Sequence, residues 1–180
     1  MFSTEQHNYL LALAREAVCA AVRQGRQLVR EADGVDAGLR EPLGAFVTLT
    51  KHGELRGCIG YTEPLFPLYE TIIRGGTAAA LQDPRFSPVA PHELDDLRME
   101  ISVLSPLRRA TPDEVIVGTH GLVVEQGRAR GLLLPQVPLE WGWQRDEFLA
   151  HTCRKAGLAL DAWQRTATLY TFTAEVFSEE

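Results

Sequence analysis

One pattern constrains the fold of this chain more than any other: it occurs twice, and the second copy lies 74 positions after the first, as from Arg56 to Arg130. Each copy predicts a strand, a glycine-containing turn and a second strand, followed by a helix and a further strand. The copies begin at TLTKHGELRGCIGY (from Thr48) and LVVEQGRARGLLLP (from Leu122). Five positions are identical between them: Gly53 and Gly127, Arg56 and Arg130, Gly57 and Gly131, Pro64 and Pro138, Leu65 and Leu139.

The following elements keep the same order and offset, which favours an internal duplication over chance. A helix is expected at 67–82 and again at 141–156, and a strand at 98–104 and again at 172–178. Two copies are too few for a solenoid. The sequence therefore predicts an α+β protein with two small antiparallel sheets. The last strand is expected to run unbroken through TLYTFTAEVF, from Thr168 to Phe177.

Composition limits the classes of function. With 180 residues and 45% hydrophobic content, the chain can build one sizeable core, whole or split into two lobes. Its net charge of -6 disfavours a broad surface for nucleic acid. Cys19, Cys58 and Cys153 form no CxxC pair, so no zinc site, other metal site or cofactor is expected. Free thiols, no leader pattern and no long apolar run indicate a cytoplasmic protein without a membrane span.

The segment LRGCIG, Leu55–Gly60, is the strongest candidate for chemistry. Strand alternation places Leu55, Gly57 and Ile59 on the core side, and Arg56, Cys58 and Gly60 on the other. A guanidinium near a thiol lowers the pKa of the thiol, and Gly60 would leave open space beside it. These features suit a reactive cysteine or an anion pocket. However, Leu132 replaces Cys58 in the second copy, so Cys58 as a small structural hydrophobe stays open.

Other side chains have both a functional and a structural interpretation. Asp83 and Arg85 bracket Pro84, where they could line a site or form a salt bridge within their own turn. His120 could act as general base only within hydrogen-bond reach of Cys58, and otherwise would bond to the backbone of its turn. The three tryptophans are expected to pack in the core or between the lobes: Trp141, Trp143 and Trp163.

Six separated motifs together resemble the AMMECR domain family, whose prokaryotic members are often called AmmeMemoRadiSam system protein A. The resemblance runs from about residue 46 to 177, and the N-terminal helix also fits. The motifs are LRGCIG (55–60), DPRF (83–86), EISVL (100–104), GTHGL (118–122), RGLLLPQV (130–137) and KAGL (155–158).

This resemblance implies one domain, 1–180, made of two subdomains with a cleft between them. Taking the repeated prolines as the crossings, we expect a large subdomain of 1–63 plus 141–180 and a small inserted one of 64–140. Each copy of the repeat would then contribute to both subdomains, as an intertwined duplication. The cleft would be lined by Leu55, Arg56, Gly57, Cys58, Ile59 and Gly60, with Asp83, Arg85 and Arg130 beside them.

Three functions remain open. The first is a binding module that holds a macromolecule, with protein or peptide favoured over nucleic acid by the acidic net charge. The family name implies radical-SAM and Memo-type proteins as partners. The second is an enzyme that uses Cys58 as nucleophile, assisted by Arg56 or His120. The third is a purely structural adaptor. The sequence does not predict an oligomeric state.

Overall fold

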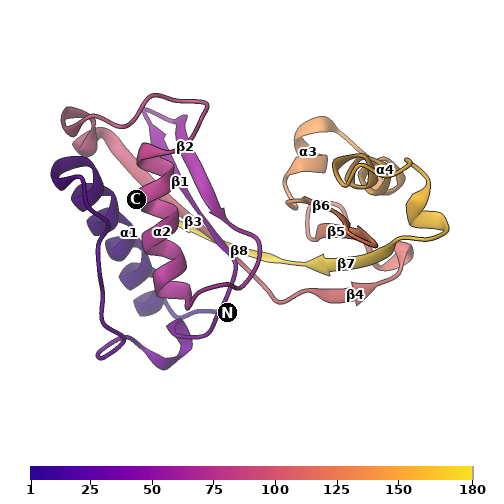
Figure 1. Ribbon diagram of the computed structural model, residues 1–180, viewed down its shortest axis with the longest axis horizontal. Helices are drawn as coiled ribbons and strands as arrows, with labels where there is room; N and C mark the ends of the chain where they lie inside the picture. Colours follow the sequence, from indigo (N-terminus) through magenta and orange to yellow (C-terminus); the bar gives the residue numbers. More distant parts are fainter. Residues whose placement is uncertain (180) are drawn as a thin grey trace. The chain divides into compact units, whose positions relative to one another are not determined.

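A computed structural model describes residues 1–179 and divides the chain into two compact units. Unit 1 is Met1–Leu104 together with the segment that starts at Glu175, and unit 2 is Ser105–Ala174. Each unit holds a four-stranded antiparallel sheet with its own helices (Figure 1). The prediction of an α+β protein with two small antiparallel sheets is confirmed.

Unit 1 packs two helices on one face of its sheet. The strand order of this sheet, called sheet 1, is β2-β1-β3-β8. Figure 1 shows α1 and α2 side by side on the same side of the strands. The elements of unit 1 are α1 (Thr4–Gln24), η1 (Ala37–Leu39), β1 (Ala45–Lys51), β2 (Glu54–Tyr61), α2 (Leu68–Leu81), η2 (Pro91–Asp96), β3 (Leu97–Leu104) and β8 (Ala174–Ser178).

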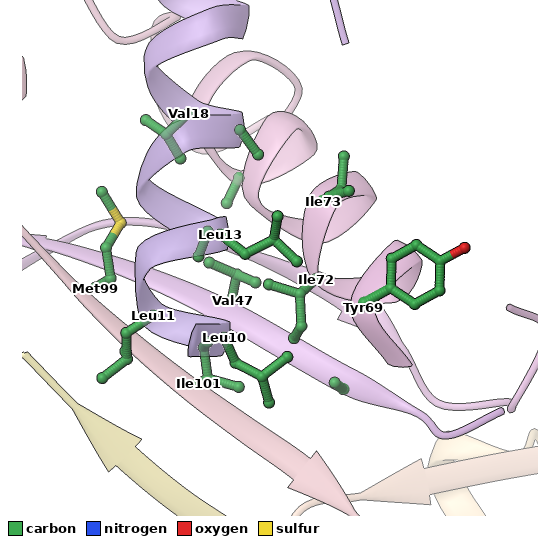
Figure 2. Packing of buried hydrophobic residues seen from close by; sticks show 14 of the residues in the cluster. Leu10, Leu11, Leu13, Val18, Val47, Tyr69, Ile72, Ile73, Met99 and Ile101 are labelled. Carbon is green, nitrogen blue, oxygen red and sulfur yellow. The ribbon is translucent and has the colours of Figure 1, made fainter. Parts of the chain in front are cut away.

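Local sequence explains where α1 starts and stops. The Ser3 hydroxyl accepts a hydrogen bond from Gln6 N while the Gln6 side chain accepts one from Ser3 N, which forms a capping box. Gly25 then ends the helix with a φ of 63°, a left-handed conformation that glycine adopts without steric cost. Between these ends, one apolar stripe of α1 packs into the core, with Leu10, Leu13 and Val18 shown in Figure 2.

Strand alternation determines which face of sheet 1 enters this core. Val47 and Leu49 of β1 are fully buried, and so are Met99 and Ile101 of the paired strand β3. Figure 2 shows Val47, Met99 and Ile101 beside the leucines of α1. The intervening residues of β1 and β3 therefore face the opposite side of the sheet.

Unit 2 repeats this plan on a smaller scale. Its sheet, sheet 2, has the strand order β4-β7-β5-β6, and Phe148, Leu149 and Cys153 of α4 are fully buried in its core. The elements of unit 2 are β4 (Arg108–Ala110), η3 (Pro112–Glu114), β5 (Gly121–Gln126), β6 (Ala129–Leu133), α3 (Val137–Trp141), α4 (Arg145–Lys155), η4 (Ala162–Gln164) and β7 (Thr168–Phe172).

The two sheets have three equivalent strands each, and they exchange the fourth. The segment that follows the third strand of one sheet forms the fourth strand of the other sheet. The order β2-β1-β3 in sheet 1 corresponds to β6-β5-β7 in sheet 2. In chain order β3 is followed by β4 of sheet 2, and β7 by β8 of sheet 1. The expectation of one unbroken strand over 168–177 is therefore wrong, because the chain changes sheets at Thr173 and β7 and β8 are separate strands.

The boundaries between units differ from the proline positions used to place them. The segment after β2 stays within unit 1, because Leu68 N donates to Glu41 O and Pro42 forms a bridge with Pro67. The chain instead leaves unit 1 after Leu104 and returns at Glu175. The inserted unit is therefore 105–174, whereas the repeated prolines suggested 64–140.

Candidate functional site

The LRGCIG segment forms most of β2, the edge strand of sheet 1, and a β-bulge interrupts it. Leu49 pairs with Gly57, but the next residue of β1, Thr50, pairs with Leu55, so Arg56 has no partner in β1. Beyond the bulge the alternation is shifted. Leu55 therefore lies on the side of Thr50, opposite the core, and is 42% exposed. Its expected place among the core residues is wrong.

The two glycines of the motif are required by close packing on opposite sides of the strand. A Cβ at Gly57 would lie 2.2 Å from the Ala79 carbonyl oxygen, so this glycine lets α2 lie directly on β2. A Cβ at Gly60 would lie 2.8 Å from Cγ of Phe46. The Ala45 carbonyl oxygen and Phe46 Cα would be closer still, at 2.1 and 2.5 Å, so the space expected at Gly60 is filled by the backbone of β1 and the Phe46 side chain.

Cys58 lies on the face of sheet 1 opposite α1 and α2. It pairs with Thr48, which in turn pairs with Glu100 of β3, so these three half-buried side chains form a row across the sheet. Thr48 Oγ1 donates a hydrogen bond to Cys58 Sγ at 3.2 Å. Phe46 and Ser102 form the next row on this face. We call these five residues, Phe46, Thr48, Cys58, Glu100 and Ser102, the Cys58 face.

The DPR turn holds the peptide groups of Cys58 from the edge of the sheet. The Asp83 carboxylate, only 4% exposed, accepts a hydrogen bond from Cys58 N at 2.9 Å. Arg85 Nη2 donates to Asp83 at 2.7 Å and to the Cys58 carbonyl oxygen at 3.4 Å. Hydrogen bonds from Arg85, and then from Cys58 N, hold the pKa of Asp83 well below its usual range. The turn therefore occupies the edge of β2 at this point.

Arg56 is bound by a carboxylate and does not contact the thiol as expected. Its Nη2 lies 2.8 Å from Glu93 Oε2, and its Nη1 donates to the Ser87 carbonyl oxygen at 3.0 Å. Lys51 Nζ and Ala90 N also donate to Glu93, which is 9% exposed. The hydrogen bond from Arg56 is the largest cause of a strongly lowered pKa at Glu93. The segment from Asp83 to Glu93 is thus fastened to β2 twice.

The remaining predicted site residues belong to unit 2. Arg130 lies in β6, where its Nε is 3.1 Å from Glu125 Oε1 on the paired strand. His120 precedes β5, and its Nδ1 accepts a hydrogen bond from Ile116 N at 3.2 Å. This backbone bond matches the structural alternative given for His120. Gly131 repeats the role of Gly57, since a Cβ there would lie 2.5 Å from Ala156 N at the end of α4.

Sequence reasoning missed two residues that shape this site, Thr48 and Glu93. A count outward from the His52–Gly53 turn places Thr48 opposite Gly57, and only the bulge moves it opposite Cys58. A bulge leaves no clear mark in a single sequence. Glu93 follows Pro91 after a polar loop, in a position typical of an exposed 3-10 turn. Its role comes from the arginine 37 residues earlier.

Two further features of the chain concern metal ions and membranes. Among residues 1–179, no group of three or more histidine, cysteine, aspartate or glutamate side chains is placed to hold a metal ion. The helices formed by the same residues lack the combined length and apolar character that crossing a bilayer requires. The cysteines Cys19, Cys58 and Cys153 are all free thiols.

Known proteins match the chain over nearly its full length. It is 47% identical over 188 aligned positions to a protein of Thermococcus onnurineus, a match that covers 98% of this chain and 91% of that protein. It is 46% identical over 186 positions to a protein of Methanothermobacter thermautotrophicus, a match that covers 99% of this chain and 96% of that protein. The crystal structure of the uncharacterized protein PH0010 from Pyrococcus horikoshii superposes with a TM-score of 0.87 at 42% identity, over 99% of this chain and 94% of that one. The AMMECR1 family model matches residues 11–177. The chain therefore belongs to the AMMECR1 family.

Proposed function

We propose that this protein is a binding module that recognises an extended segment of another protein on the Cys58 face of sheet 1. One observation supports this more than any other. The peptide groups of Cys58 are held at the sheet edge by Asp83 and Arg85, while its half-buried sulphur lies on the face opposite the helices. A side chain on a fixed backbone suits selective recognition, because little freedom is lost when a partner binds.

The charges favour a protein segment over nucleic acid. The three arginines of the predicted site are paired with carboxylates: Arg56 with Glu93, Arg85 with Asp83, and Arg130 with Glu125. A nucleic-acid surface needs cations that are available to phosphates. On the Cys58 face itself, Glu100 contributes a negative charge beside uncharged groups. The small polar side chains next to Phe46 suit a peptide that contains both polar and apolar residues.

A cysteine-dependent enzyme is the second candidate, and the Thr48 hydroxyl favours it because a donor at Sγ stabilises a thiolate. The histidines of unit 1 do not supply the base that such an enzyme needs. His7 bonds to Glu175, His52 lies 3.9 Å from Asp96, and His92 is exposed. Binding is therefore the better supported function. The partners we propose are the radical-SAM and Memo-type proteins of the same cell, in a reducing cytoplasm where three free thiols persist.

The test compares binding by the wild type and by Cys58→Ser, with Cys19→Ser as the matched control. Cys19 is also half-buried, but it packs against the core from α1. Each protein is used to capture partners, followed by mass spectrometry of bound proteins and analysis of bound nucleic acid. The purified radical-SAM and Memo-type proteins are tested as defined ligands. Loss of one specific protein with Cys58→Ser alone supports the proposal, and identical capture by all three proteins refutes it.

Alkylation separates the enzyme from the binding module. The rate of reaction of each cysteine with iodoacetamide is followed against pH by peptide mass spectrometry. Burial raises the pKa of Cys153, which makes it an internal unreactive reference. If Cys58 reacts faster than the other two cysteines near pH 7, the result would favour the enzyme. If the midpoint of its rate against pH lies at or above that of a free cysteine, the enzyme alternative is removed.

A further inference from the structure

Unit 2 exposes large apolar side chains that the proposed function does not use. Trp141 is not part of the core: it is 70% exposed at the end of α3, and Leu139 of the same helix is 61% exposed. Side chains of this size seldom lie exposed together in one short helix without a binding role. Ile116, 55% exposed, lies in the turn before Gly118, and Gly118 packs against Leu139. These three apolar side chains therefore belong to neighbouring parts of unit 2.

The exposed tryptophan is the outer member of a stack of three rings. The centroids of Trp141 and Trp143 are 6.0 Å apart with an interplanar angle of 16°. Trp143 stacks in turn on His151 of α4, at 3.8 Å and 9°. Trp143 also packs against the core of unit 2. The indole of Trp141 is thus supported from behind by two parallel rings that are anchored in the fold, so it forms a rigid platform.

Carboxylates lie next to this platform in the chain or are linked to its neighbour Arg145 by ion pairs. Glu140 precedes Trp141 in α3, and Asp146 and Glu147 lie in the first turn of α4. Asp113 is brought to the same place by Arg145, since the two side chains are 3.2 Å apart. Arg145 is the single cation among these residues, and Asp113 and Asp146 both pair with it. Four carboxylates against one guanidinium give this part of unit 2 a net negative charge.

We propose that this tryptophan patch, made of Ile116, Leu139 and Trp141 with Asp113, Glu140 and Asp146, binds a cationic protein segment that places an arginine or lysine over Trp141. Indole is the side chain that best attracts a cation through its ring face, and nearby carboxylates strengthen that attraction. Leu139 and Ile116 offer apolar contact for the neighbouring residues of the segment. The same carboxylates repel phosphates, so a nucleic acid is not the occupant.

The proposal is independent of the Cys58 face, because all of its residues lie in unit 2. The probe is a short synthetic peptide of alternating leucine and arginine, and its match replaces each arginine with citrulline, which keeps the shape and removes the charge. Binding to the full chain is followed by NMR through the indole N–H signals. Trp163 lies in η4 and packs against the core, so its signal is the internal reference.

The expected result is a saturable shift of the Trp141 signal with the arginine peptide and roughly tenfold weaker binding of the citrulline peptide. Trp141→Leu keeps apolar area and should weaken binding by a similar factor, as should the charge-removing pair Glu140→Gln and Asp146→Asn. Leu160→Ala, another exposed apolar side chain of unit 2, should change nothing. The backbone NMR spectrum of each variant checks that it is folded.

Several results would overturn the proposal. Equal affinity for the citrulline peptide would show that charge is not recognised, and unchanged binding by Trp141→Leu would show that the indole is not the platform. Tighter binding of an oligothymidylate than of the arginine peptide would identify a base-stacking surface instead. Self-association in sedimentation experiments that Trp141→Leu abolishes would identify a second copy of this chain as the occupant.

Discussion

Replacement of Gly57 by alanine tests whether the close spacing between β2 and α2 depends on this one residue. The added Cβ would lie 2.2 Å from Ala79 O, whereas ordinary contacts begin at about 3.4 Å. The backbone of α2 or β2 must therefore move by roughly 1.2 Å, and Ala79 O belongs to the helix backbone, so no side-chain rotation relieves the clash. Gly57 does not have a positive φ, so the effect is steric.

The cost follows from the energetics of overpacking. Extra methyl groups forced into a packed core cost about 1–3 kcal/mol, and a backbone clash belongs at the upper end of that range. Alanine loses less backbone entropy on folding than glycine, which offsets about 0.5–1 kcal/mol of this cost. We expect Gly57→Ala to lower the free energy of unfolding by about 2 kcal/mol, which corresponds to a fall in Tm of roughly 4–8 °C for a chain of this size.

Gly76→Ala in α2 is the matched control, because it adds the same methyl group where space exists. Its nearest contacts would be Ala14 O at 3.4 Å and Val18 Cγ2 at 3.5 Å, both ordinary. Alanine is the better helix former by about 0.8–1 kcal/mol, so this variant should be more stable than the wild type. Urea unfolding followed by circular dichroism measures both. Equal stability of the two variants would refute the steric explanation of Gly57.

Three further predictions concern the bonds around β2 and the second copy. Because Asp83 and Glu93 have lowered pKa values in the folded protein, the stability that they contribute is complete above their ordinary pKa values of 3.8 and 4.5 and is lost as the pH falls below them. The urea midpoint of the wild type should therefore drop between pH 6 and pH 3. The drop should be smaller in the double variant Asp83→Asn, Glu93→Gln. At pH 7, Glu93→Gln alone should cost about 3 kcal/mol in urea unfolding by leaving Arg56 and Lys51 without a carboxylate, whereas exposed Glu54→Gln should cost nothing measurable. Gly131→Ala should destabilise unit 2 as Gly57→Ala does unit 1, because its Cβ would lie 2.5 Å from Ala156 N; hydrogen exchange that is unchanged in α4 would contradict this.

The sequence was sufficient for the fold class because the relevant patterns are local. Alternation in β1 and β3, the Ser3 capping box and the two glycine turns each predict an element that the structure contains. The hairpins with their helices at a common offset then predict two similar sheets. Gly57 and Gly131 show why the glycines match, since each lets a helix backbone approach its hairpin.

The candidate site was less predictable because it depends on contacts between distant residues. Nothing in the neighbourhood of Arg56 shows that its guanidinium binds Glu93, so the sequence suggested a contact with the nearby thiol. The bulge at Arg56 also moved Leu55 to the other face, which no count of alternating residues could reveal. The position of Cys58 was predicted correctly, opposite the core face, because residues 57–61 pair regularly with β1 and the bulge displaces only the residues before Gly57.

The exchange of fourth strands explains why the expected offset failed at the end of the repeat. An offset of 74 carries β3 onto β8, yet β7 occupies the place in sheet 2 that β3 occupies in sheet 1. The ladders show this directly: Leu49 pairs with both Gly57 and Met99, and Val124 pairs with both Gly131 and Leu169. Met99 and Leu169 are therefore equivalent, at an offset of 70. The four-residue difference lies between the helix and the third strand, where unit 1 contains the DPR turn and Glu93. The segment that binds the peptide groups of Cys58 is thus the part in which the first copy differs from the second.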